Sequence, residues 1–194
     1  MTMRFFKLIF VIGLLTVTVS GAMANPVLTV DNALGLYFDA EAVNNNLMLD
    51  TPSTVDMYLI FTNPTVDFID AWQAKVTISD GTEIIGVSYP LGTTGVSEGP
   101  DDWSAASSAP IPCNTLTKLA VFSVATDAMA ETVIFLGGID SPALAGELPA
   151  VRLLNGEWIS VPVASGDPSV PVAGINSTTP TENSNWGYVK SLFR

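Results

Sequence analysis

Short stretches in which apolar and polar residues alternate dominate this chain, and turn residues separate them. In the stretch 54–62, the apolar residues Val55, Met57, Leu59 and Phe61 fall on one face. A period of two residues is the period of a half-buried β-strand, and a helix cannot follow it. No segment after residue 24 keeps a sustained helical period, so the alternation predicts an all-β fold. In the stretch 69–79, the residues expected to face inward are Trp72, Ala74, Val76 and Ile78, and those expected to face outward are Gln73, Lys75 and Thr77.

Turn signals give the expected order of the strands. Asp80-Gly81 predicts a hairpin between the stretches 69–79 and 83–89. Asn155-Gly156 is the strongest short hairpin signal in the chain. About eight short strands at near-regular spacing predict an antiparallel β-sandwich or a barrel. The sandwich, of jelly-roll or similar type, is favoured because Tyr58 and Ile60 place apolar groups on the second face of their strand. The expected strands are 33–39, 54–62, 69–79, 83–89, 116–126, 131–139, 150–154 and 157–163.

The first 24 residues have the pattern of a secretory signal peptide. Arg4 and Lys7 precede the apolar run 8–19, and Ala22-Met23-Ala24 has the small residues that a signal peptidase requires. The apolar run is short for a permanent membrane anchor. We therefore expect Sec-type export and a secreted, periplasmic or cell-surface location, with residues 1–24 removed.

Composition divides the rest of the chain into three parts. Residues 25–164 contain the alternating stretches and are expected to form the sandwich, in which 90–115 is a long connection rich in Gly, Ser and Pro. Residues 165–185 are rich in Pro, Ser, Thr and Asn and are expected to be an extended linker. Residues 186–194 form a distinct tail.

The amino-acid composition excludes several classes of function. The chain has 19 acidic and 7 basic residues, so we expect no nucleic-acid partner. It has no histidine, which excludes serine triads and the usual zinc sites. The single cysteine, Cys113, cannot form an internal disulfide; it is free or pairs with another chain. No nucleophile motif is present, so we expect no enzyme, and a glycoside hydrolase that uses only carboxylates is the remaining catalytic alternative.

Four aromatic residues are candidates for ligand binding. Flat aromatic rings stack on the apolar faces of sugars. Trp103 lies in the long connection, Trp158 shares a strand face with Ser160, and Tyr58 and Tyr89 could join either of them. The alternative is that these rings cap the core. Trp72 is expected in the core because its strand face is apolar.

Calcium is a possible cofactor, because it binds several oxygen ligands and pins loops in exported sandwiches. Two oxygen-rich clusters could bind it, although neither has the spacing of a known calcium loop. The first consists of Glu98, Asp101 and Asp102, and the second of Asp39, Glu41, Asn44, Asn45, Asn46 and Asp50.

The tail is a candidate docking segment. It contains Lys190 and Arg194 and no acidic residue, and Trp186, Val189 and Phe193 would share a helical face. Nine residues are too few for a stable isolated helix, so the tail needs a surface to pack against. It either docks on another component or folds back on its own sandwich to complete a sheet edge.

Three stretches resemble the cohesin-like and carbohydrate-binding β-sandwich group. A strand ending in Phe61-Thr62-Asn63-Pro64 is followed by the aromatic-bearing strand 70–78 and later by Leu116–Val124. The resemblance covers about residues 27–163 and implies a sandwich that binds a dockerin protein or a polysaccharide through one face. No partner-contacting residue is matched by position.

These observations predict an exported, non-catalytic module that binds a protein or a glycan outside the cytoplasm. The alternative is a structural or cell-surface component that is anchored or sorted through its tail. The ligand and the oligomeric state stay open.

Overall fold

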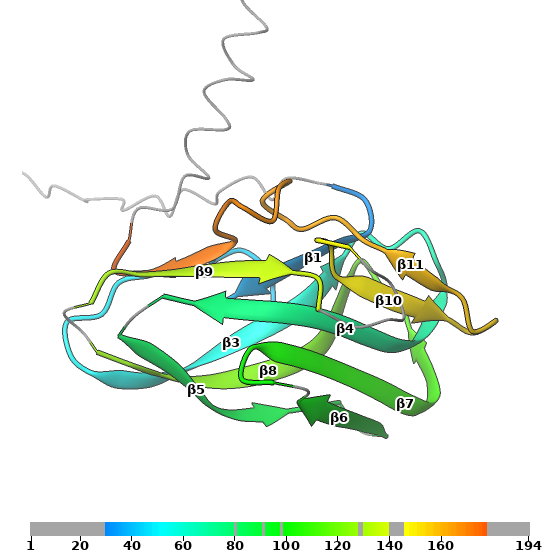
Figure 1. Cartoon of the computed structure of the whole chain (residues 1–194), viewed down its shortest axis with the longest axis horizontal. Coiled ribbons are helices and arrows are strands. Elements are labelled where there is room, and N and C mark those ends of the chain that lie inside the picture. Colours follow the sequence, from blue (N-terminus) through cyan, green and yellow to red (C-terminus); the bar gives the residue numbers. More distant parts are fainter. Residues whose placement is uncertain are drawn as a thin grey trace, which may run out of the picture.

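A computed structural model describes residues 30–79, 81–90, 92–97, 99–127, 130–139 and 146–177. In these residues the chain forms strands and turns without a helix, and the strands build two facing sheets (Figure 1). The prediction of an all-β sandwich is confirmed. The predicted signal peptide 1–24 and the tail 186–194 lie outside the described residues. The strands are β1 (Ala33–Tyr37), β2 (Asn46–Leu47), β3 (Ser53–Thr62), β4 (Phe68–Ile78), β5 (Thr82–Ser88), β6 (Thr93–Ser97), β7 (Asp102–Pro112), β8 (Leu116–Thr126), β9 (Thr132–Gly137), β10 (Ala150–Leu153), β11 (Trp158–Ser160) and β12 (Ala173–Ile175).

The smaller sheet has the antiparallel order β1-β3-β8-β5. Its centre is the pair β3 and β8, which runs from Ser53 opposite Thr126 to Thr62 opposite Leu116, with a bulge after Leu59. At one edge, β1 is covered by an isolated parallel bridge between Leu34 and Val163. The other edge is β5.

The larger sheet is organised around β4. Its path is β11-β10-β4-β9-β12-β2, and the hairpin β6–β7 lies on the other side of β4. β10 and β9 share one side of β4: β10 pairs with its first half and β9 with its second half. The strand pair β12–β2 is parallel, whereas the other paired strands are antiparallel.

The core lies between the two sheets and contains the residues that alternation predicts. Trp72 is fully buried, as expected, and Met57, Leu59 and Phe61 of β3 are fully buried as well. Gln73 was expected to face solvent, but it is only 3% exposed.

One predicted hairpin is present and the other is wrong. Asn155-Gly156 joins β10 and β11, which pair antiparallel, and Gly156 has the positive φ of 86° that such turns require. The chain also reverses at Gly81, where φ is 88°, but β4 belongs to the larger sheet and β5 to the smaller one. The turn sequence encodes a reversal of direction, and tertiary pairing decides which strands meet.

The connection 90–115 was expected to be a loop, but it contains β6 and β7. Its Ser, Ala and Pro content gives it a low strand propensity. Long-range pairing overrides that propensity, because β7 aligns with β4 from Phe68 opposite Pro112 to Lys75 opposite Asp102.

The expected linker 165–185 is wrong for its first part, because β12 lies within it. Residues Ala173 to Ile175 are buried and pair with β9 and β2. The backbone N–H of Asn176 then donates to Leu47 over 2.8 Å. The sandwich therefore extends at least to Ser177, and residues 178–185 lie outside the described residues.

Candidate functional site

The outer face of the larger sheet brings together charged and aromatic side chains from four strands. Residues directly opposite each other in a sheet point to the same side. Gln73 lies opposite Ser104, Lys75 opposite Asp102, and Arg152 opposite Trp158. These positions alternate with Trp72, Ala74 and Val151, which are buried in the core. We call this surface the outer sheet face and define it by Asp70, Lys75, Asp102, Arg152 and Trp158.

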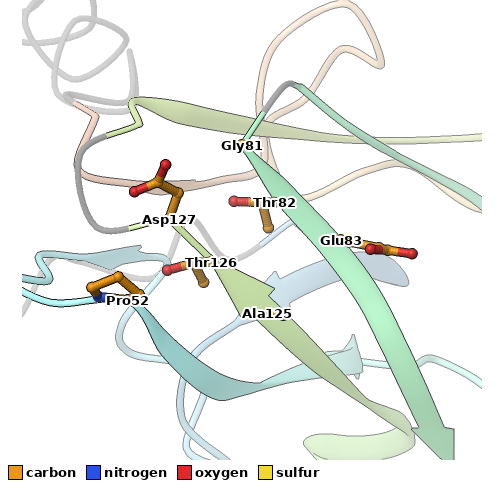
Figure 2. Close-up of a pocket in the computed structure, with 7 residues that line it drawn as sticks. All are labelled: Pro52, Gly81, Thr82, Glu83, Ala125, Thr126 and Asp127. Atoms are coloured by element: carbon orange, nitrogen blue, oxygen red, sulfur yellow. The ribbon is translucent and has the colours of Figure 1, made fainter.

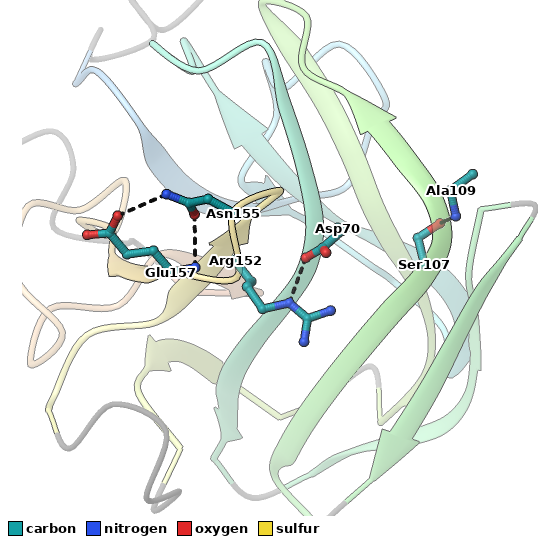
Figure 3. A network of polar contacts seen from close by, with 6 residues as sticks. All are labelled: Asp70, Ser107, Ala109, Arg152, Asn155 and Glu157. Carbon is teal, nitrogen blue, oxygen red and sulfur yellow. Dashed lines mark hydrogen bonds and ion pairs between the residues drawn. The ribbon is translucent and has the colours of Figure 1, made fainter.

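Arg152 is the centre of one half of the outer sheet face. Its Nε atom donates to Oδ1 of Asp70 over 2.7 Å, as Figure 3 shows. Its guanidinium carbon also lies 5.7 Å from the centroid of the Trp158 ring, within the range of a cation–π contact. About a third of the Arg152 side chain and a quarter of the Asp70 side chain are exposed (32% and 24%). The group is accessible, yet each of its members is held by another.

The other half is an ion pair between Lys75 and Asp102, whose charged atoms are 3.8 Å apart. Between the two halves, Ala71 and Ala150 are buried. A partner that approaches this face therefore meets the two charged groups and the Trp158 ring.

Local polar contacts are present in the turn before β11 and in the middle of β7. In the turn before β11, Asn155 accepts a hydrogen bond from the Glu157 backbone at 2.9 Å and donates to its carboxylate at 3.3 Å (Figure 3). In β7, the Ser107 hydroxyl accepts a hydrogen bond from the Ala109 backbone at 3.3 Å. The hydrogen bonds in the turn thus fix the backbone directly before Trp158.

The four aromatic residues predicted to bind ligand do not form one site. Trp103 is in β7 and not in a loop; it is only 9% exposed and packs edge-on against Phe122 at a centroid distance of 5.2 Å. It has almost no free ring face, so it belongs to the core. The ring centroid of Tyr89 lies 6.2 Å from that of Trp72, and burial raises the pKa of the Tyr89 phenol.

Tyr58 and Trp158 are half-buried and lie on opposite sheets. Tyr58 alternates with core residues of β3, so it faces outward from the smaller sheet, where the Lys118 ammonium lies 5.4 Å from its ring centroid. Trp158 is the one predicted aromatic residue on the outer sheet face. The pairing of β10 with β11 that positions it is signalled in the sequence by Asn155-Gly156, but its contact with Arg152 is not.

The acidic clusters proposed for calcium have other contacts. Glu98 lies outside the described residues, and Asp102 pairs with Lys75. Asp39 accepts hydrogen bonds from the backbone N–H groups of Glu41, Val43 and Asn44 at 3.1, 3.0 and 2.6 Å, which closes the loop after β1. In the described part of the chain, no three acidic, His or Cys side chains are grouped as metal ligands.

Cys113 is half-buried and packs against the core as a small apolar side chain. Burial raises the pKa of its thiol, and the charge of Asp67 acts in the same direction, whereas a backbone hydrogen bond lowers the pKa. A thiol with a raised pKa is a poor nucleophile near neutral pH.

Two cavities lie at one end of the sandwich, around the start of β5. The first, of about 590 Å³, is shown in Figure 2 and is bounded by the starts of β3 and β5 and the end of β8. The second, of about 390 Å³, lies between the sheets beside Trp103.

The described residues contain no helix with the length and apolar character needed to cross a membrane.

Comparison with known proteins identifies the fold. No family model matches the chain, and no curated protein matches its sequence. A type II cohesin domain from the cellulosome of Acetivibrio cellulolyticus superposes with a TM-score of 0.53 at 12% identity, over 76% of this chain and 96% of that domain.

Two further cohesins were solved as complexes. The sixth cohesin of Acetivibrio cellulolyticus scaffoldin B, with a Cel5 dockerin, gives a TM-score of 0.52 at 10% identity, over 77% of this chain and 100% of that one. The third ScaB cohesin of R. flavefaciens, with a group 1 dockerin, gives 0.50 at 13% identity, over 77% and 98%. The chain has a cohesin-like β-sandwich fold.

Proposed function

We propose that this protein is an exported, non-catalytic module that binds a protein partner through the outer sheet face. Cohesins of the same fold have been solved in complex with dockerin proteins, which supports a protein partner. The first 24 residues support export. The observation on which the proposal mainly rests is the group formed by Arg152, Asp70 and Trp158.

The residue types on this face suit a protein interface. Trp and Arg are the side chains that most often dominate the binding energy of such interfaces. Here both are held in place before binding, because Asp70 fixes the guanidinium and the turn at Asn155 fixes the strand of Trp158. A fixed side chain loses less conformational entropy when a partner binds.

The geometry favours a protein over a glycan. Sugar stacking requires free aromatic faces, but Trp103 is buried, Tyr58 and Trp158 lie on different sheets, and Arg152 lies over the Trp158 ring. The outer sheet face itself is balanced in charge, with Lys75 beside Asp102 and Arg152 beside Asp70, so a complementary partner surface would carry both signs of charge.

The experiment is an affinity capture from the culture fluid and cell-surface fraction of the source organism, with the chain from Asn25 to Arg194 as bait. The test variant combines Arg152→Ala with Trp158→Ala. The control is Ile85→Ala, which removes an apolar side chain that is 56% exposed on the smaller sheet. All three baits are checked for folding by thermal denaturation.

The proposal predicts that the parent and the Ile85 control retain the same proteins and that the double variant loses them. Retention of those proteins by the double variant would exclude the outer sheet face. Binding of polysaccharide alone, without a retained protein, would replace the proposal with a glycan-binding function.

A further inference from the structure

The two cavities are neighbours, and acidic residues line both of them. Both are lined by Thr82 and Glu83. Asp127 lines the larger cavity and Asp101 the smaller one, and the described residues that line the two cavities include no lysine or arginine. Three carboxylates gathered in one surface region attract a basic segment.

The strand beside these cavities has an open edge. β5 is the last strand of the smaller sheet, and within the described residues no strand pairs with its second side. This edge strand has seven residues, Thr82 to Ser88, of which Glu83 and Ile85 are exposed. Edge strands with unpaired backbone groups are templates for another strand. By contrast, the opposite edge is covered by the bridge from Leu34 to Val163.

The described chain ends close to this edge. The hydroxyls of Thr82 and Thr132 are 2.8 Å apart, and Thr132 lies opposite Ile175 in the pairing of β9 with β12. Ser177, the last described residue, follows two positions later. Residues 178–185 could span about 26 Å when extended. The length of β5 is about 23 Å, so residues 178–185 are long enough to bring residue 186 to the start of this strand.

The sequence of residues 186–194 complements the acidic region. Lys190 and Arg194 are basic, and the segment has no acidic residue. If it forms a strand, Tyr188, Lys190, Leu192 and Arg194 share one face. An added strand could therefore face the cavities with a basic and apolar side.

We infer that the segment from Trp186 to Arg194 binds along the edge of β5 in its own chain, with its basic side chains near Glu83, Asp101 and Asp127. Backbone hydrogen bonds to β5 would provide affinity, and charge would set the position. The bound segment would close the open edge against pairing with other chains. This inference is independent of the outer sheet face, which lies on the other sheet.

Zero-length carbodiimide coupling tests the inference on the chain from Asn25 to Arg194. The reagent joins a lysine to a carboxylate that it touches, and peptide mass mapping identifies the pair. Lys190 is expected to couple to Glu83, Asp101 or Asp127. A mixture of ¹⁵N-labelled and unlabelled protein distinguishes coupling within one chain from coupling between chains. Lys75, whose ammonium lies 3.8 Å from the Asp102 carboxylate, is expected to couple to Asp102 and reports that the reagent is active.

A charge-neutral variant provides the matched comparison. Glu83→Gln, Asp101→Asn and Asp127→Asn together remove the coupling sites, and occupancy is then read from the protection of Lys190 against acetylation. Protection should fall about fivefold, the population change that corresponds to 1 kcal/mol. The control Glu157→Gln lies in the turn before β11 and should leave protection unchanged.

Three results would overturn the inference. Lys190 could couple to carboxylates elsewhere in the chain, or to none while Lys75 couples to Asp102. Its coupling products could contain one labelled and one unlabelled peptide, which would assign the edge to a second copy. Protection of Lys190 could also be the same in the neutral variant and the parent.

Discussion

The Nε atom of Arg152 donates a 2.7 Å hydrogen bond to Oδ1 of Asp70, two residues that are 82 positions apart in the chain. The pairing of β10 with β4 places them together, and a bulge after Arg152 shifts the register between the two strands at this point. The same guanidinium lies over Trp158. One arginine thus connects the central strand of the larger sheet to the strand at its edge.

Replacing Asp70 with Asn should affect partner binding more than stability. Both side chains of the ion pair are partly exposed, so its loss should lower the free energy of unfolding by less than about 1 kcal/mol. Without the carboxylate, the guanidinium is no longer fixed, and binding through the proposed face should weaken. Urea denaturation measures the first effect, and affinity capture measures the second. A loss of stability with unchanged capture would show that the pair is only structural.

Gly35→Ala should destabilise the protein by about 1–3 kcal/mol, a typical cost of overpacking. A β-carbon at residue 35 would lie 2.6 Å from a ring carbon of Tyr37, which is itself buried. The control is Gly86→Ala, where the nearest atom is 3.8 Å away, on Ser123. Equal melting temperatures for the two variants would contradict the close contact at Gly35.

Trp103→Ala should cost about 3–5 kcal/mol of unfolding free energy, as for other buried tryptophans. Its ring packs against Phe122 and is almost fully buried. Trp158→Ala should cost less than about 1 kcal/mol, because Trp158 is partly exposed near the sheet edge. Chemical denaturation of both variants separates a core residue from a surface residue.

Tyr37 should make the fold sensitive to alkaline pH. Burial, together with the nearby charge of Asp39, raises its pKa from 10.0 to about 12. The folded state thus keeps the phenol proton more tightly than the unfolded state. This stabilisation is fully present below pH 10 and is lost as the pH rises from about 10 towards 12.

The measurement is the free energy of unfolding as a function of pH. Tyr37→Phe cannot ionise, so its stability should fall less than that of the parent over this range. In parallel, phenolate absorbance should show one tyrosine of the parent, absent in the variant, that ionises near pH 12. Identical pH profiles for the two proteins would mean that Tyr37 is more solvated than the structure shows.

Local patterns predicted most of the fold. Alternation located β3, β4, β8 and β9 to within a few residues, because the side-chain period of a strand is written directly in the sequence. Asn155-Gly156 predicted the hairpin β10–β11, because its backbone conformation depends on those two residues. Trp72 was predicted in the core from its own strand face.

The errors arose where long-range pairing overrides local preference. β7 forms from a segment rich in Ser, Ala and Pro because β4 offers it a partner. β12 forms inside an apparent linker because β9 and β2 flank it. For the same reason, Trp103 is in the core although its neighbours in the sequence resemble a loop.

Residues close together in the chain are enough to predict that it builds strands, where most of them lie, and which of their faces are apolar. Which strands pair, the separation of β4 and β5 into different sheets, and the contacts of Arg152 with Asp70 and Trp158 become visible only in the folded structure. The difference lies in the range of the interactions. Side-chain alternation and turn geometry depend on neighbouring residues, whereas strand pairing and surface contacts join residues that are tens of positions apart.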